Sequence, residues 1–63
     1  MPKTDVKVKL LGESGNAFAI LGKTIKALKQ AGHEDLAKEY QAEATKGDYD
    51  NLLRVTMEYV KVE

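Results

Sequence analysis

The residues most suggestive of phosphate chemistry lie in the stretch Ala17–Thr24. Its order, Ala-Phe-Ala-Ile-Leu-Gly-Lys-Thr, fits a relaxed phosphate-loop pattern in which Ala or Gly is followed, after four residues, by Gly-Lys-Thr. A phosphate loop needs a flexible, glycine-rich turn whose backbone N–H groups converge on the ligand. Here the four intervening residues are apolar with helical spacing, and 63 residues are too few for a nucleotide-binding α/β sheet. We therefore reject a nucleotide site and predict a helix.

The segment just before it, Gly12–Asn16, is a second candidate anion site. It follows a predicted strand and opens a predicted helix, whose first N–H groups could hold a carboxylate or a phosphate. However, Glu13 lies within the segment and no lysine follows it directly. We favour a turn in which Ser14 or Asn16 caps the helix by accepting a backbone N–H bond.

No residues with catalytic or metal-binding spacing are visible. His33, the single histidine, follows a helix-ending glycine and is assigned a surface or capping role. The carboxylates that follow it are Glu34, Asp35, Glu39 and Glu43. Their spacing is that of a solvated helix face, whereas acid–base catalysis needs carboxyl groups in a desolvated cleft. We predict no catalytic residue, no metal site and no cofactor, and hence a non-enzymatic protein.

The lysines support nucleic-acid binding as an alternative function. Residues 1–30 carry six lysines and two carboxylates, a net charge of +4, whereas residues 31–63 carry four basic and eight acidic residues, a net charge of −4. Five lysines would share the strand and the first helix, namely Lys7, Lys9, Lys23, Lys26 and Lys29. The zero net charge, the single arginine and the scarcity of aromatic residues for stacking speak against this function.

Length and composition describe one small domain, spanning residues 1–63. The chain has no cysteine, so neither a disulfide nor a cysteine zinc site can stabilise it. Its charged content of 32% and short apolar runs predict no transmembrane segment. The absence of cysteine and of an apolar leader after Met1 predicts a cytoplasmic protein.

A strand is predicted near the N-terminus, over residues 5–11. Val6, Val8 and Leu10 alternate with Lys7 and Lys9, which is the period of a strand with one buried and one wet face.

The stretch Gly15–Gly32 is predicted to form the central helix, ending near Ala31. Its apolar face comprises Phe18, Leu21, Ile25 and Leu28 and is widened by Ala17, Ile20 and Ala27. Gly32 stands where a helix-ending glycine is expected. Gly22 lies inside the helix, where glycine is costly, and this suggests that another element approaches it closely.

Two more helices are predicted downstream. The second spans about Glu34 to Thr45, and its narrow apolar stripe comprises Leu36, Ala37, Tyr40 and Ala44. Asp48 is the expected N-cap of the third. The apolar face of this third helix comprises Tyr49, Leu52, Leu53, Thr56, Met57 and Val60.

The last five residues, 59–63, fit either the end of a helix or a strand. The first strand needs a partner for its backbone donors and acceptors, so we favour a short C-terminal strand paired with it. The alternative is that two copies of the first strand pair across a dimer axis. The fold class is therefore α+β, with helices on one face of a minimal sheet. Because small sheets with open edges invite pairing with another chain, a homodimer is expected.

Two segments resemble a family of small uncharacterised bacterial and phage proteins. They read Gly-x-x-Gly-Asn-Ala-Phe from Gly12 and Ala-Thr-x-Gly-Asp-Tyr-Asp-x-Leu-Leu from Ala44. The resemblance implies a compact protein and no particular mechanism. Asn16, Asp48 and Tyr49 are its polar positions and our candidate partner-binding residues. The expected function is thus a protein–protein interaction module with an unknown protein partner, such as a phage- or host-encoded modulator.

Overall fold

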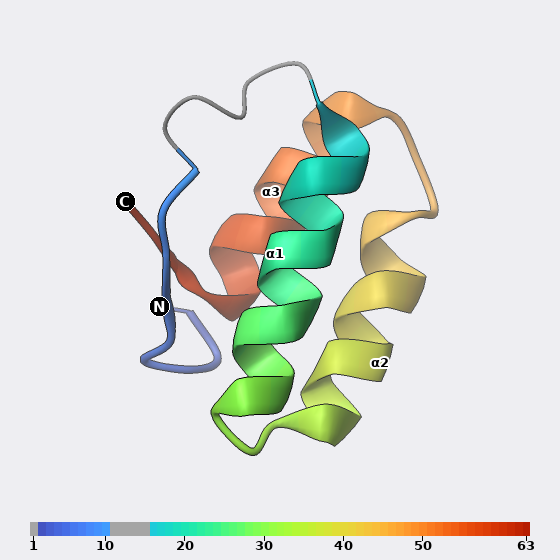
Figure 1. Cartoon of the computed structure of the whole chain (residues 1–63). Coiled ribbons are helices and arrows are strands. Elements are labelled where there is room, and N and C mark those ends of the chain that lie inside the picture. The colour runs from blue at the N-terminus through green and yellow to red at the C-terminus, as the bar shows by residue number, and fades with distance from the viewer. Residues whose placement is uncertain (1, 11–15) are drawn as a thin grey trace.

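The computed structural model describes residues 2–10 and 16–63 of the chain. Its elements, in chain order, are β1 (Lys7–Val8), α1 (Ala17–Gln30), α2 (Glu34–Ala44), α3 (Tyr49–Tyr59) and β2 (Lys61–Val62). The three helices pack together, and the two strands lie beside α1 and α3, on the side away from α2 (Figure 1). The predicted α+β class and the three helices are confirmed.

The ends of α1 follow directly from its sequence. Asn16 is extended at the N-cap, and its Oδ1 accepts a hydrogen bond from the Ala19 N–H at 3.1 Å. At the other end Gly32 has a φ of 85°, and its N–H donates to the Lys29 carbonyl at 3.0 Å. The His33 N–H donates to the Leu28 carbonyl at 2.8 Å, which completes a glycine-terminated helix end. Ser14, the other predicted cap, lies outside the described residues.

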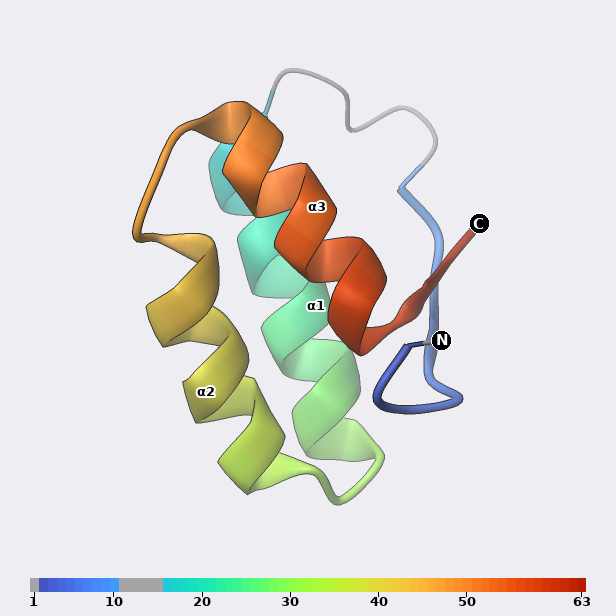
Figure 2. The ribbon, with the colours of Figure 1, turned by 180° about the vertical axis from the view of Figure 1, so that it is seen from behind.

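The two strands pair in parallel and join the two ends of the chain. Lys7 is aligned with Lys61, and Val8 with Val62. The Lys61 N–H donates to the Val6 carbonyl at 2.8 Å, and the Glu63 N–H donates to the Val8 carbonyl at 2.9 Å. The predicted C-terminal strand is therefore confirmed. From behind, α3 crosses in front of α1 and leads directly into β2 (Figure 2).

The core lies between the three helices and the inner face of β1. It comprises Val8, Ile20, Leu28, Ala37, Tyr40, Ala44, Leu52, Val55, Tyr59 and Val60. Thr24 and Thr56 are also fully buried, and each hydroxyl donates to a carbonyl one turn earlier in its own helix. Because Thr56 donates to Leu52, the Tyr40 hydroxyl must be the donor in its 2.7 Å bond with Thr56.

Two predicted core residues are instead on the surface. Phe18 is 86% exposed and Met57 is 59% exposed. In α1 the buried stripe is Ile20, Thr24 and Leu28, and Phe18 lies about 200° around the helix from Ile20. In α3 the buried stripe includes Val55 and Tyr59, which leaves Met57 on the outer side. The expected core positions of Phe18 and Met57 were therefore wrong.

The expectation that Gly22 allows a close approach was also wrong. Beyond the nearby backbone of α1, a Cβ added at Gly22 would meet no heavy atom of the described residues within 4 Å, and the residue is exposed. Among the described glycines, Gly47, between α2 and α3, has a packing reason, since an added Cβ would lie 2.9 Å from Asn51 Cβ. None of the helices in the described parts of the chain has the length and apolar character to cross a membrane.

Candidate functional site

The three predicted partner-binding residues lie where α1 and α3 begin. Asn16 is the N-cap of α1, and Asp48 is the N-cap of α3, where its Oδ1 accepts from the Asn51 N–H at 3.0 Å. Tyr49 follows as the first residue of α3 and is half-buried. The structure therefore gives Asn16 and Asp48 a local capping role.

An apolar hollow lies beside these helix ends, between the start of α1, the end of α2 and the start of α3. Its volume is about 280 Å³. It is lined by Ala17, Phe18, Leu21, Ala44, Thr45, Gly47, Asp48, Tyr49 and Leu52. Asp48 and Tyr49 thus belong to one surface. Asn16 does not line it but directly precedes Ala17, which does. We call this hollow together with the Phe18 ring the bundle-end patch.

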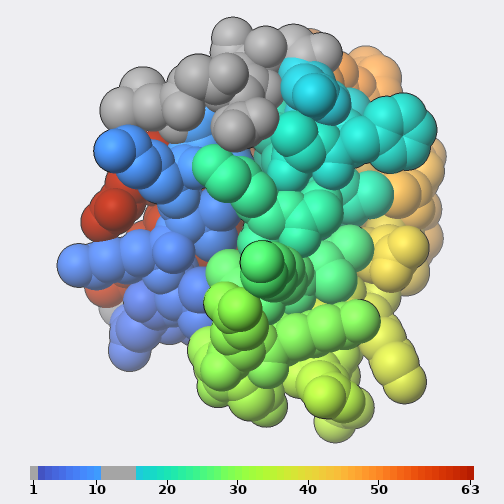
Figure 3. All heavy atoms as spheres, in the orientation of Figure 1, coloured from blue at the N-terminus to red at the C-terminus, as the bar shows by residue number. Residues whose placement is uncertain are grey.

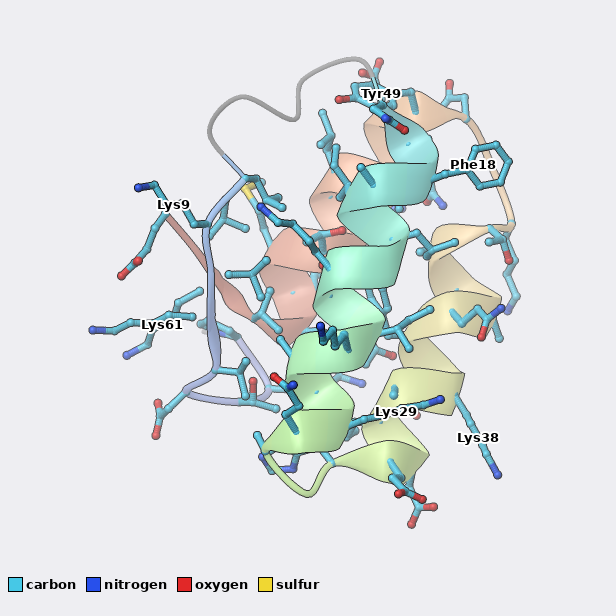
Figure 4. All side chains as sticks on the ribbon, in the orientation of Figure 1. Lys9, Phe18, Lys29, Lys38, Tyr49 and Lys61 are labelled. Atoms are coloured by element: carbon cyan, nitrogen blue, oxygen red, sulfur yellow. The ribbon has the colours of Figure 1, made fainter. Side chains whose placement is uncertain are left out.

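Phe18 is the most unusual feature of the bundle-end patch. Its ring stands away from α1 toward the segment that connects α2 with α3 (Figure 4). With 86% of its surface exposed, it gains almost none of the free energy that burial of a phenyl ring provides. The ring therefore contributes little to the stability of the chain that carries it.

The α2–α3 connection is held in place, which fixes the far wall of the hollow. The Asn51 side-chain amide donates to the Glu43 carbonyl at 3.1 Å, tying the start of α3 to the end of α2. The Thr45 hydroxyl donates to the Gln41 carbonyl at 2.7 Å, and Gly47 leaves room for Asn51. The hollow is consequently a built feature of the helix junction.

Away from the bundle-end patch, a polar cluster joins the N-terminal segment to α2 and α3. The Tyr59 hydroxyl donates to Glu39 Oε2 at 2.8 Å, and Lys3 Nζ lies 3.1 Å from the same oxygen. These two hydrogen bonds, the one from Tyr59 foremost, hold the pKa of the Glu39 carboxyl below its usual range. Burial raises the pKa of Tyr59, and the bond to Glu39 raises it further. The cluster ties the N-terminal segment to both helices.

The other chemical motifs of the sequence do not form sites. Gly22, Lys23 and Thr24 of the phosphate-loop-like stretch lie inside α1, and the Thr24 hydroxyl is buried and bonded to the Ile20 carbonyl at 2.9 Å. His33 precedes α2 without a side-chain capping bond, beside a shallow polar depression. Within residues 2–10 and 16–63, no three His, Asp or Glu side chains come close enough to hold a metal ion. The anion candidate Gly12–Asn16 lies outside the described residues except for Asn16.

The five predicted nucleic-acid lysines are all on the surface. Lys23 Nζ donates to the Lys9 carbonyl at 2.9 Å, so the helix and strand lysines are neighbours. Lys7 lies 3.9 Å from Glu63. The side chains of Lys26 and Lys29 extend into solvent on the outer side of α1.

Sequence reasoning missed the bundle-end patch because it placed Phe18 in the core. The one available signal was the rotation of the apolar stripe: Ile20, Thr24 and Leu28 recur every four residues, and Phe18 falls outside that row. Thr24 was not included in the predicted apolar face, so this row of buried residues was not recognised.

The chain was compared with protein-family models, with curated proteins and with solved structures. No family model matches it, and neither a curated protein nor a solved structure is similar to it. The family resemblance noted in the sequence stays a prediction. A functional assignment therefore has to be argued from the surfaces themselves.

Proposed function

We propose that this protein is a non-enzymatic interaction module that binds through the bundle-end patch. The observation that carries this proposal is the 86% exposure of Phe18 beside an apolar hollow. Contiguous exposed apolar patches mark interaction sites, and the Phe18 ring is continuous with the apolar lining of the hollow. Because 86% of Phe18 is exposed, most of the free energy gained by burying its ring, about 2 kcal/mol, is available to a complex.

The partner in this proposal is a second copy of the chain. The bundle-end patch presents a protruding ring and a hollow next to each other, so a two-fold axis would place each Phe18 in the hollow of the other copy. A cavity of about 150 Å³ accommodates benzene, and the hollow measures about 280 Å³. The volume is therefore sufficient for one phenyl ring.

Charge also permits this self-association. The formal net charge of the chain is zero, so two copies do not repel one another at long range. In the connection beside the hollow, Lys46 forms an ion pair with Glu43 of its own chain, which balances its charge locally. The surface of one chain is 4195 Å², and the bundle-end patch is a small part of it. An interface below about 1,200 Å² belongs to the weak class, so we expect dissociation in the micromolar range or above.

The proposal is tested by the molar mass in solution. Sedimentation equilibrium across micromolar to millimolar concentrations should show a monomer that converts to a dimer. Phe18→Ala should remove the dimer, and Thr45→Arg should do the same by filling the hollow while leaving the ring in place. Met57→Ala is the matched control, because it deletes a second exposed large apolar side chain that does not line the hollow.

Three results would contradict this function. The first is a monomer mass at all concentrations, which would leave the bundle-end patch to a different protein. The second is a dimer that Phe18→Ala does not weaken. The third is a dimer that Met57→Ala weakens as much as Phe18→Ala does. Circular dichroism of each variant would check that the helices are retained.

A further inference from the structure

The described part of the chain separates its charges by element. Residues 6–10 and 16–33 contain five lysines and no carboxylate, and they form β1, α1 and the turn after it. The remaining elements carry most of the acidic residues, with eight carboxylates against four basic groups in residues 34–63. A surface built from α1 and β1 is therefore positive, and one built from α2 and α3 is negative.

The five lysines share one side of the molecule. α1 and β1 pack against each other, and the bond from Lys23 Nζ to the Lys9 carbonyl joins them. Figure 3 shows that these two elements make up most of one face of the molecule. We call this the lysine face and define it by Lys7, Lys9, Lys23, Lys26 and Lys29. Lys61 lies at one margin beside the strand, and Lys38 on α2 at the other (Figure 4).

Among the described residues, carboxylates neutralise little of the charge of Lys7, Lys9, Lys26 and Lys29. Lys7 is 3.9 Å from Glu63, and Lys61 is 3.6 Å from Asp5, but both pairs are well exposed and so contribute little. Lys9, Lys26 and Lys29 form no ion pair with any residue of the described ranges. Three lysines of this face thus have no carboxylate partner among the described residues.

In residues 2–10 and 16–63, the lysine face also lacks the apolar centre that a protein partner requires. Stable protein interfaces bury an apolar core inside a polar rim. Between the lysines of α1, the outward positions are Ala19 and Gly22, which are small. Phe18 lies toward α2 and belongs to the bundle-end patch (Figure 4). A partner that needs only cations, such as a phosphodiester backbone, fits this surface better than a protein does.

We propose that the lysine face binds the phosphate backbone of nucleic acids without reading their sequence. The face offers cations, and the one exposed aromatic ring among the described residues, Phe18, belongs to the bundle-end patch, so contacts go to phosphates. Five such contacts on duplex DNA give a slope of log K against log salt of about −4.5, since each contributes about −0.9. This activity uses a surface separate from the bundle-end patch.

The test is fluorescence anisotropy of a labelled, random-sequence DNA duplex, titrated with the protein at several salt concentrations. We expect binding at low salt that weakens steeply as salt rises. The double variant Lys26→Gln/Lys29→Gln should weaken binding about tenfold and make the slope shallower by about 2. The control Lys46→Gln/Arg54→Gln changes the net charge equally but lies off the lysine face, and it should bind like the unaltered chain.

Several outcomes would overturn the proposal. They are the absence of binding at low salt, a slope near zero, and an equal loss of affinity in the Lys46/Arg54 control. A polyglutamate peptide of matched charge serves as competitor. If it displaces the duplex as well as unlabelled DNA does, the face recognises acidic chains in general and the nucleic-acid proposal is wrong.

Discussion

At the residue scale, Gly22 inside α1 and Gly32 just after α1 have opposite effects on the stability of the fold. Gly22 is exposed within α1 and has ordinary helical geometry, so nothing in the described structure requires a glycine there. Gly32 has a φ of 85°, in the left-handed region that side chains with a Cβ disfavour. One glycine therefore costs stability and the other supplies it.

This contrast leads to a paired prediction. Gly22→Ala should raise the free energy of unfolding by about 1 kcal/mol through helix propensity. Gly32→Ala should lower it by about 1–2 kcal/mol because of backbone strain. Urea denaturation monitored by circular dichroism measures the free energy of unfolding of both variants. A loss of stability in Gly22→Ala would restore the idea that another element packs against this position.

The Glu39 carboxyl gives a prediction about acid stability. Its pKa is held below the ordinary value of 4.5, chiefly by the Tyr59 hydroxyl and then by Lys3. The native state therefore binds fewer protons than the unfolded chain as the pH falls below 4.5, and stability is lost as the pH falls through the folded pKa. Tyr59→Phe should raise the pKa of Glu39 and make the acid loss of stability shallower.

Carbon-detected NMR titration of the Glu39 carboxyl would measure this change directly. Lys3→Met removes both the hydrogen bond from the ammonium group and its positive charge, and it should also raise the pKa of Glu39. A Glu39 pKa that is unchanged in Tyr59→Phe would show that the hydroxyl does not stabilise the carboxylate. Urea unfolding at a series of pH values supplies the matching stability curve.

At the scale of elements, the sequence predicted which segments are helical, how they end and which stripe of α2 is buried, but it misplaced part of the buried faces of α1 and α3. Asn16, Gly32 and Asp48 act through local backbone geometry, so their roles could be read from neighbours in sequence. The orientation of α3 was harder, because Leu52, Val55 and Tyr59 form one apolar row while Leu53 and Met57 form another. Packing decides between two such rows, and no local signal does.

The same dependence on long-range packing explains why the bundle-end patch was not predicted from the sequence. The edge-on contact of Tyr40 with Tyr59, with ring centroids 5.5 Å apart, selects the buried row of α3. This contact joins residues far apart in sequence, and a single sequence does not reveal it. The hollow of the bundle-end patch likewise depends on three helix ends meeting, so only its polar members, Asp48 and Tyr49, were singled out beforehand.

At the scale of the whole molecule, the parallel pairing of the chain ends closes the fold. Lys3 and Thr4 donate backbone hydrogen bonds to the carbonyls of Glu58 and Tyr59, at 2.8 and 3.2 Å. The Thr4 hydroxyl adds a bond to the Tyr59 carbonyl at 2.8 Å. The N-terminal segment therefore covers the end of α3, and β2 continues the same contact. A 63-residue domain has roughly 3–9 kcal/mol of stability, so a few such bonds are a large share of it.

Deletion of the last three residues, 61–63, tests this closure. It removes three backbone bonds to β1 and its flanks, at 2.8, 2.9 and 3.1 Å, and should lower the free energy of unfolding by about 3 kcal/mol. Replacement of the same three residues by alanine keeps the backbone bonds. It should cost much less, because their side chains are exposed and their ion pairs are weak. Urea unfolding of both variants separates backbone from side-chain contributions. An equal loss in the two would mean that side chains, and not the parallel pairing, hold the chain ends together.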